Sequence, residues 1–258
     1  MLLVIDVGNT NIVMGLYENG ILQATWRMST RDEKTSDETG IAIYSFFKGE
    51  NKNIKDTTGV IIGSVVPNIM YSLIHGIKKY IGIDPIVVTA DMPLGIKILR
   101  DNPRECGVDR VVNVIAAKEK YGTPAIVIDY GTANTFDVIN EKSEFVTGFI
   151  TAGIKICADE LYKKAAQIPK VELISPETLI AKTTVDSLQA GIVASKIGET
   201  IEIINTLKRE LNIPDAKVIA TGGLANIIDP DCDIFDVYDP VLTLDGLKII
   251  YEEYFKDR

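Results

Sequence analysis

The chain has 258 residues, 46% hydrophobic and 24% charged, a composition typical of a soluble globular protein with one large core or two smaller ones. Its formal net charge of −9 argues against a nucleic-acid-binding surface, which needs clustered positive charge, although backbone N–H groups can still bind an anion locally. No apolar run approaches the roughly 20 residues that span a bilayer, and Asp6 interrupts the apolar start, so we expect neither a membrane span nor a secretory signal.

The first half of the chain alternates strand and helix patterns. Short β-branched runs with an intervening Glu-Asn-Gly turn predict three strands over residues 2–29. Residues 35–49 are typical of a helix, for which Ser36 or Asp37 is the expected N-cap. Further predicted elements are a strand within 58–68, a helix over about 68–81, a strand at 85–90, and a loop that enters a helix within 102–122.

The second half repeats the opening pattern. Residues 125–150 again predict three strands, and Asp129 follows Asp6 by 123 positions. At that offset, without a gap, the matches are Val4 with Val127, Ile5 with Ile128, Gly8 with Gly131, Asn11 with Asn134 and Glu18 with Glu141. Either two ordinary hairpins coincide, or the chain holds two similar domains, 1–115 and 116–258, with a cleft between them. Helices over about 155–167, 185–211 and 242–255 and a strand within 216–226 complete the prediction.

The few cysteine and histidine residues limit the kinds of metal site and catalytic mechanism that the chain can hold. Cys106, Cys157 and Cys232 lack metal-ligand spacing, and an odd, scattered set indicates reduced thiols in a cytoplasmic protein. The single histidine, His75, excludes multi-histidine metal sites, argues against a Ser-His-Asp or Cys-His mechanism, and is expected to be packed or at the surface. We therefore expect any general base to be a carboxylate.

Two turns with glycine, Asn and Thr follow the aspartates. "DVGNTN" (6–11) and "DYGTANT" (129–135) could be ordinary hairpin turns, or could hold phosphate oxygens on successive backbone N–H groups. An aspartate beside an anion is explained if it binds a cation such as Mg²⁺. Because the turns belong to a repeat, the pair favours phosphate binding more than either turn alone.

Two further motifs have an ordinary structural interpretation beside the functional one. "ATGGLAN" (220–226) could admit a base or sugar at Gly222 and Gly223, or could serve tight strand-to-helix packing. In "GVDR" (107–110), Asp109 could accept a proton from a substrate hydroxyl and Arg110 could bind an anion. Equally, Asp109 could cap a helix beside a solvated arginine.

The motifs in this order resemble the type III pantothenate kinases of the acetate and sugar kinase/Hsc70/actin superfamily. The resemblance covers nearly the whole chain and also includes "WRMSTRDEKTSDE" (26–38), "GSVVPN" (63–68), "DNPRECGVDR" (101–110) and "DPVLTLDGL" (239–247). It implies an α/β protein of two similar ribonuclease H-like domains, the actin-like ATPase fold, flanking a nucleotide cleft.

The resemblance also implies site residues, cofactors and partners. Asp109 is the expected general base, and ATP, Mg²⁺, a monovalent cation (K⁺ or NH₄⁺), pantothenate and a second copy of the chain are the expected cofactors and partners. Asp129 is expected to bind the monovalent cation and Asp6 to hold Mg²⁺ through water. The phosphate and nucleotide residues would be Asp6, Val7, Gly8, Asn9, Thr10, Asn11, Gly131, Thr132, Ala133, Asn134, Gly222 and Gly223, and the pantothenate residues Gly107, Val108, Asp109, Arg110 and Thr184.

The chain departs from the family pattern at four places. Val108 replaces an alanine, and Arg100 stands where an aromatic residue is usual. "GFITAG" (148–153) replaces the family's "GG-x-I-x-PG", and "IVASKIGE" (192–199), after Gly191, lacks a usual tyrosine–glycine pair. The last three of these departures, at Arg100, 148–153 and 192–199, affect the expected acceptor pocket and dimer rather than the phosphate turns. Alternatives to a pantothenate kinase are therefore a non-catalytic nucleotide- or pantothenate-binding regulator, and a kinase or phosphatase acting on another substrate.

Overall fold

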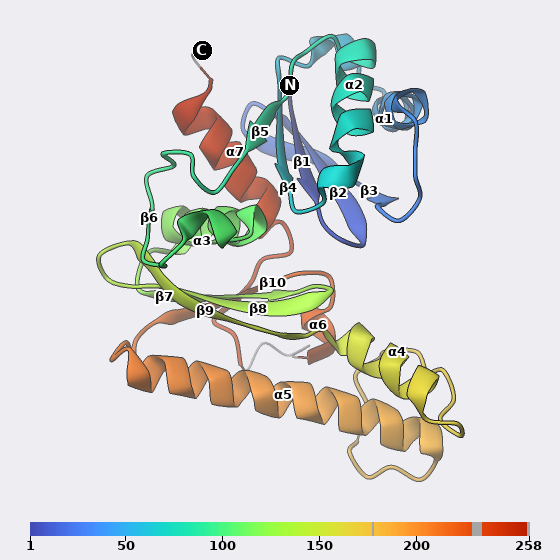
Figure 1. The fold of residues 1–258 in the computed structure, drawn as a ribbon, viewed down its shortest axis with the longest axis vertical. Helices are drawn as coiled ribbons and strands as arrows, with labels where there is room; N and C mark the ends of the chain where they lie inside the picture. Colours follow the sequence, from blue (N-terminus) through green and yellow to red (C-terminus); the bar gives the residue numbers. More distant parts are fainter. Residues whose placement is uncertain (177, 229–233, 257–258) are drawn as a thin grey trace. The chain divides into compact units, whose positions relative to one another are not determined.

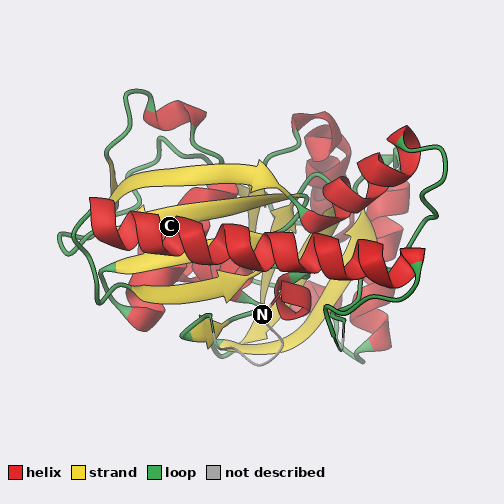
Figure 2. Cartoon of the chain, turned by 90° about the horizontal axis from the view of Figure 1, so that it is seen from below, coloured by secondary structure: helices red, strands yellow, loops and turns green. Residues whose placement is uncertain are grey.

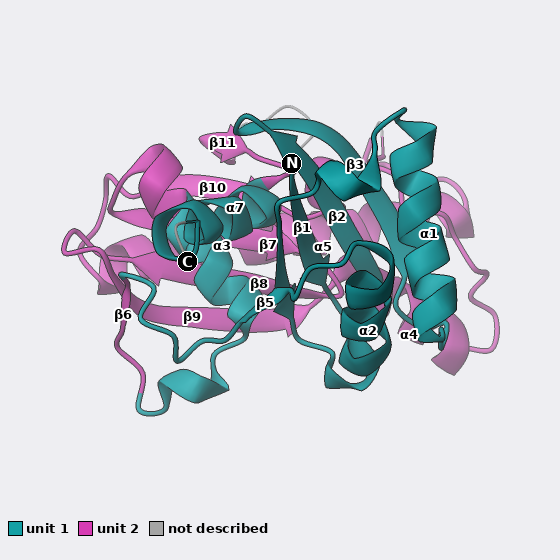
Figure 3. Ribbon diagram, turned by 90° about the horizontal axis from the view of Figure 1, so that it is seen from above, with its two compact units in different colours: residues 1–95, 101–116, 242–258 teal, residues 96–100, 117–241 magenta. Residues whose placement is uncertain are grey.

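The structure is a computed structural model that describes residues 1–176, 178–228 and 234–256, so Cys232 lies outside the described residues. The chain divides into two compact units (Figure 3). Unit 1 comprises residues 1–95, 101–116 and 242–258, and unit 2 comprises residues 96–100 and 117–241. Among the described residues, no helix combines the length and apolarity needed to cross a membrane.

Unit 1 contains a five-stranded sheet in the order β3-β2-β1-β4-β5 (Figure 1). β1 pairs antiparallel with β2 and parallel with β4. At the predicted Glu-Asn-Gly turn between β2 and β3, Asn19 and Gly20 both have positive φ, as a tight hairpin turn requires. The strands are β1 (Leu2–Val7), β2 (Asn11–Glu18), β3 (Ile21–Ser29), β4 (Gly59–Ser64) and β5 (Ile86–Val88).

Helices cover both faces of this sheet. On one face, Ile43 and Phe47 of α1 and Leu73 of α2 join a core cluster with apolar residues of β1, β2 and β4. On the other, α7 packs so closely that a Cβ on Gly63 of β4 would lie 3.2 Å from the Leu247 side chain. The helices are α1 (Ser36–Gly49), α2 (Met70–Tyr80), α3 (Val108–Tyr121) and α7 (Leu242–Tyr254), with 3₁₀ turns at Ile54–Asp56, Pro67–Ile69 and Pro103–Glu105.

The C-terminal helix belongs to a different unit from the one that the sequence-based division gave it, since that division assigned residues 116–258 to one domain. Residues 242–258 belong to unit 1, and the boundary within α3 falls after Ala116. Gly246 of α7 lies against α3, where an added Cβ would come within 2.7 Å of a Val112 methyl group. Gly15 of β2 similarly lies beside Leu244. Because α7 packs closely against α3, β2 and β4, it belongs to unit 1, although it follows unit 2 in sequence.

The predicted N-cap of α1 was wrong. Thr35, not Ser36 or Asp37, is the cap: its Oγ1 accepts a hydrogen bond from the Glu38 N–H at 3.2 Å, and its own N–H donates to Glu38 Oε2 at 2.8 Å. The Thr-Ser-Asp-Glu run offers three residue types that cap helices. Thr35 rather than Ser36 or Asp37 is the cap because Glu38, three residues after Thr35, completes a capping box with it.

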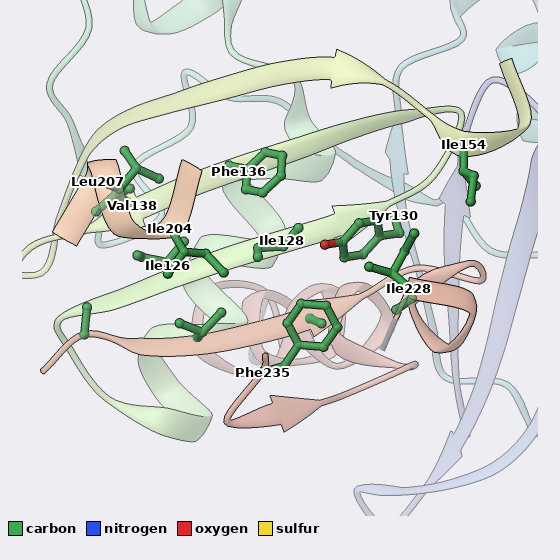
Figure 4. Packing of buried hydrophobic residues seen from close by; sticks show 14 of the residues in the cluster. Ile126, Ile128, Tyr130, Phe136, Val138, Ile154, Ile204, Leu207, Ile228 and Phe235 are labelled. Carbon is green, nitrogen blue, oxygen red and sulfur yellow. The ribbon is translucent and has the colours of Figure 1, made fainter. Parts of the chain in front are cut away.

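Unit 2 contains a six-stranded sheet in the order β11-β10-β7-β8-β9-β6. α5 lies along one face of this sheet (Figure 2), where Ile204 and Leu207 pack on Phe136, Val138 and neighbouring side chains (Figure 4). The elements are β6 (Lys97–Ile98), β7 (Ala125–Tyr130), β8 (Ala133–Ile139), β9 (Glu144–Ala152), β10 (Lys217–Thr221), β11 (Val237–Tyr238), α4 (Ile154–Lys164), α5 (Thr184–Glu210) and α6 (Ala225–Ile228). The two-residue strands and α6 had not been predicted.

The repeat is real but contains a gap. Removing the added edge strand β6 leaves the order β9-β8-β7-β10-β11, which matches β3-β2-β1-β4-β5 strand for strand. β7 and β9 lie 123 positions after β1 and β3, but Val7 pairs with Ile12 whereas Tyr130 pairs with Asn134. The second turn is therefore one residue shorter, and Asn134 corresponds to Ile12, not to Asn11.

Candidate functional site

The first candidate phosphate turn joins β1 to β2. The Gly8 N–H donates to the Asn11 carbonyl at 3.0 Å and closes the turn, leaving Asn9 exposed at its tip. Thr30, the residue after β3, holds the turn from the side: its N–H donates to the Thr10 carbonyl at 3.0 Å and its Oγ1 to the Gly8 carbonyl at 2.8 Å. The turn is fixed before any ligand binds, which lowers the entropic cost of holding an anion on its backbone.

The second turn is built in the same way, with one residue fewer. The Gly131 N–H donates to the Ala133 carbonyl at 3.2 Å, and the Gly153 N–H donates to the Thr132 carbonyl, also at 3.2 Å. A Cβ on Gly153 would collide with the carbonyl oxygens of Gly131 and Thr132. Thr30 and Gly153 are therefore equivalent supports, which the sequence analysis missed. Their spacing of 123 residues, the offset of the repeat, could have identified them as equivalent.

Asp6 and Asp129 occupy equivalent positions near the carboxyl ends of β1 and β7. Gly222, just after β10, lies against Asp129: a Cβ there would come 2.6 Å from Asp129 Oδ1 and 2.5 Å from the Tyr130 carbonyl oxygen. Gly222 has a φ of +91°, which also favours glycine. Gly223 is different, because a Cβ there would meet nothing within 4 Å and could face a ligand.

The donors at these aspartates fit the cations that the family resemblance implies. Among the described residues, no three His, Cys, Asp or Glu side chains form a protein-only metal cage. Mg²⁺ bound through substrate phosphates and water needs only one or two carboxylates, and Asp6 fits that need. Beside Gly222, the carboxylate of Asp129 and the Tyr130 carbonyl present oxygens within one glycine-sized space. Carbonyl oxygens are donors that K⁺ accepts.

The candidate acceptor segment begins α3 in unit 1. The half-buried Asp109 is in the first turn of the helix, and its Oδ1 accepts a hydrogen bond from the Arg110 N–H at 2.9 Å. Burial raises the pKa of the Asp109 carboxyl, against the opposing effect of that hydrogen bond and of the Arg110 charge. A raised pKa makes Asp109 a stronger proton acceptor than an exposed aspartate. Arg110 itself is 5% exposed. It is therefore not solvated, unlike in the alternative interpretation of an Asp109 that caps a helix beside a solvated arginine.

Thr184 and Asn134, two more of the predicted site residues, lie in unit 2. Thr184 is the exposed first residue of α5, which Thr183 caps by accepting a hydrogen bond from the Asp186 N–H at 3.1 Å. Asn134 is fully buried, and its pairing with Tyr130 places its side chain on the α5 face of the sheet, opposite Asp129. Side chains of adjacent strand residues point to opposite faces, so Asn134 and Asp129 do not line one surface.

Arg100, which stands where the family usually has an aromatic residue, belongs to unit 2 and contacts β9 of the same unit. Its guanidinium lies 5.4 Å from the centre of the Phe145 ring, and Nη2 donates to the Gly148 carbonyl at 3.4 Å. His75 is exposed, and its ring lies 4.0 Å from that of Tyr71 between centroids, tilted by 30°, which fits the expectation of a packed or surface residue. Cys106 is buried and Cys157 is half-buried.

The two units share the same strand order, apart from the extra edge strand β6, and each has a supported turn between its first two strands. These features define the actin-like ATPase and sugar kinase fold. Residues 2–206 match the family described as type III pantothenate kinase. The chain belongs to this family, a group of kinases that use ATP.

Solved structures support the fold. A protein from Campylobacter jejuni described as a Baf family transcriptional activator is 19% identical, with 97% of this chain and 98% of that chain covered and a TM-score of 0.58. A protein from Sinorhizobium meliloti described as a 2-dehydro-3-deoxygalactonokinase is 10% identical, with 99% and 97% covered and a TM-score of 0.60. The activator of 2-hydroxyisocaproyl-CoA dehydratase from Clostridium difficile, solved with ADPNP, is 12% identical, with 100% and 97% covered and a TM-score of 0.52.

Proposed function

We propose that the protein transfers the γ-phosphoryl group of ATP to the primary hydroxyl of pantothenate, giving 4′-phosphopantothenate, the first step of coenzyme A biosynthesis. The observation that carries this proposal is the Gly-Val-Asp-Arg segment, which keeps the aspartate and arginine of the family pattern and has a half-buried Asp109 at the start of α3, in a chain of the type III pantothenate kinase family. Both turns retain the backbone geometry that suits phosphate oxygens.

In this proposal Asp109 accepts the proton of the acceptor hydroxyl as that oxygen attacks the γ-phosphorus in line. Arg110, Gly107, Val108 and Thr184 bind and orient pantothenate. The turn residues 8–11 and 131–133 hold the phosphates, and the Gly222-Gly223 turn binds near adenosine. Such a site accelerates phosphoryl transfer mainly by positioning the reactants and offsetting phosphate charge.

Two cations complete the proposed site. Asp6 would hold Mg²⁺ through water, and Asp129 would hold K⁺ or NH₄⁺, where the cation offsets charge on the phosphates. Replacing potassium by sodium in the assay tests the second assignment. We expect lower turnover in sodium; equal turnover in the two salts would remove the monovalent cation from the site.

The deciding assay measures ADP release by the purified protein with ATP, Mg²⁺ and potassium, with and without pantothenate. We expect release that depends on pantothenate. ADP release with another hydroxyl compound from a panel, but not with pantothenate, would identify a kinase with a different acceptor. Binding of nucleotide or pantothenate with no ADP release would instead identify a regulator.

We also propose a cytoplasmic homodimer. Large apolar side chains in unit 2 are exposed, including Ile150 at 63%, Leu179 at 61% and Ile180 at 76%. Burying them in a second copy would remove apolar surface from water. Light scattering after size-exclusion chromatography should give twice the 28.3 kDa chain mass, and Ile180→Lys should reduce it towards one chain. A wild-type protein that elutes as one chain would contradict the dimer.

A further inference from the structure

A polar cluster at one end of the α5–sheet interface lies directly behind the second phosphate turn. Lys196 of α5 is almost completely buried, with a side-chain exposure of 5%, and its Nζ lies 2.8 Å from Glu199 Oε2. Glu199 Oε1 in turn accepts a hydrogen bond of 2.6 Å from Thr151 Oγ1 of β9. Removing one member would leave a buried or half-buried charge with fewer partners, so the three side chains form one coupled unit.

The next residue of α5 extends this cluster to a second strand. Thr200, 1% exposed, shares a hydrogen bond of 2.7 Å with the hydroxyl of Tyr130, the last residue of β7. Tyr130 immediately precedes Gly131, and Thr151 lies two residues before Gly153, the support of the turn. Successive residues of one helix thus bind β7, which leads into the second turn, and β9, which ends just before its support Gly153.

β8, the strand that follows the second turn, contributes Asn134, which pairs with Tyr130 of β7 on one side and with Thr151 of β9 on the other. Directly paired residues project to the same face of a sheet, so the three side chains lie together beside α5. The two segments that depart from the family pattern, 148–153 and 191–199, meet in the hydrogen bond between Thr151 and Glu199.

Unit 1 provides an internal comparison. The positions equivalent to Tyr130, Asn134 and Thr151 are Val7, Ile12 and Met28, which pair in the same register. All three are buried members of the apolar core of unit 1. Apolar residues at these three positions therefore form a well-packed core in unit 1. The polar residues at the equivalent positions of unit 2 are not needed for packing.

We propose that Thr151, Lys196, Glu199 and Thr200 are positioning residues that hold the second phosphate turn in its ATP-binding geometry. They would act through Tyr130 and Gly153, without touching the nucleotide. This inference rests on the proposed binding of ATP phosphates at Gly131–Ala133. It assigns a role to two segments that otherwise appear only as departures from a family pattern.

The test compares Thr151→Val, which removes the hydroxyl but keeps the shape, with Thr151→Ser, which keeps it. The affinity for ATP is measured by calorimetry without any acceptor, and hydrogen exchange follows the amides of residues 131–133. We expect Thr151→Val to weaken ATP binding by about tenfold, the ratio to which one hydrogen bond to a charged group corresponds, and to speed exchange in the turn. Thr151→Ser should restore both values.

Ile204→Val is the matched control, because it removes one methylene from the α5 core away from the turn. It should lower the melting temperature without changing ATP affinity or exchange at residues 131–133. Thr151→Val behaving like Ile204→Val in both measurements would overturn the inference. A wild-type protein that binds ATP but does not phosphorylate pantothenate would overturn only the proposed acceptor, and one that binds no ATP would overturn both.

Discussion

Gly222 lies against Asp129, so that a single added methyl group would occupy the space between the Asp129 carboxylate and the Tyr130 carbonyl. β10 and β7 run parallel, with Thr221 paired to Asp129, and the positive φ of Gly222 turns the chain across the end of β7. Gly222 therefore shapes the surroundings of the proposed cation site, whereas its neighbour Gly223 faces open space.

This difference separates two substitutions of adjacent glycines. Gly222→Ala should destabilise the protein by about 2 kcal/mol or more, because it combines a strained backbone with overpacking. Gly223→Ala should leave the melting temperature within about 2 °C of wild type but weaken ATP binding if adenosine approaches this glycine. Thermal melts and nucleotide titrations of both variants measure this contrast. Unchanged ATP affinity in Gly223→Ala would place the nucleotide elsewhere.

Asp109→Asn tests the proposed general base. We expect turnover to fall by about 10²- to 10⁴-fold while ATP affinity stays at the wild-type value. Arg110→Lys, which keeps the charge but loses the planar donor group, should mainly raise the KM for pantothenate. Wild-type turnover in Asp109→Asn would remove this residue from the chemistry and return it to a structural role in the first turn of α3.

The raised pKa of Asp109 also predicts two dependences on pH. Because the carboxylate form accepts the proton, kcat/KM should fall as pH drops through a value above the ordinary aspartate pKa of about 3.9. Since the folded state binds this proton more tightly than the unfolded state, protonated Asp109 stabilises the fold at low pH, and this contribution is lost as pH rises through the raised pKa. Asp109→Asn should therefore melt above wild type at pH 7, and the difference should shrink towards pH 4. An equal difference at both pH values would contradict the raised pKa.

The N-terminus of α1 offers a direct stability test. Thr35→Ala removes the capping box and should cost about 1 kcal/mol, or roughly 2–4 °C in melting temperature. Ser36→Ala is the matched control, since Ser36 lies inside the helix and does not cap it. Thermal unfolding monitored by circular dichroism compares the two variants. Equal melting temperatures would show that the capping box contributes nothing measurable.

The sequence predicted the long elements because their periodic patterns agree with local turn signals, as in the Glu-Asn-Gly turn after β2. It did not predict that α7 packs in unit 1, because that depends on how Gly246 and Gly15 fit distant side chains. Nor could it place the gap in the repeat, since matching Asn11 with Asn134 in letters conceals a one-residue shift in strand pairing. The sequence also did not predict the polar cluster on α5. Thr151 and Glu199 are 48 residues apart and come into contact only when α5 packs on the sheet of unit 2.

Asn134 is the residue where stability and function should separate most clearly. It is 0% exposed, and neither its Oδ1 nor its Nδ2 has a hydrogen-bond partner among the described residues. A buried amide without partners costs about 1–3 kcal/mol, and unit 1 has Ile12 at the equivalent position. Asn134→Ile should therefore raise the melting temperature by several degrees.

The same substitution should weaken ATP binding, because Asn134 follows the second turn directly and belongs to its polar support. Ile12→Val, a conservative change at the equivalent position of unit 1, is the control and should lower stability slightly, as expected for a lost core methyl group. Melting curves and ATP titrations of the two variants give both quantities. A stabilised Asn134→Ile protein with unchanged ATP affinity would mean that the amide serves neither packing nor the turn, whereas a destabilised one would mean that Asn134 has hydrogen-bond partners in solution.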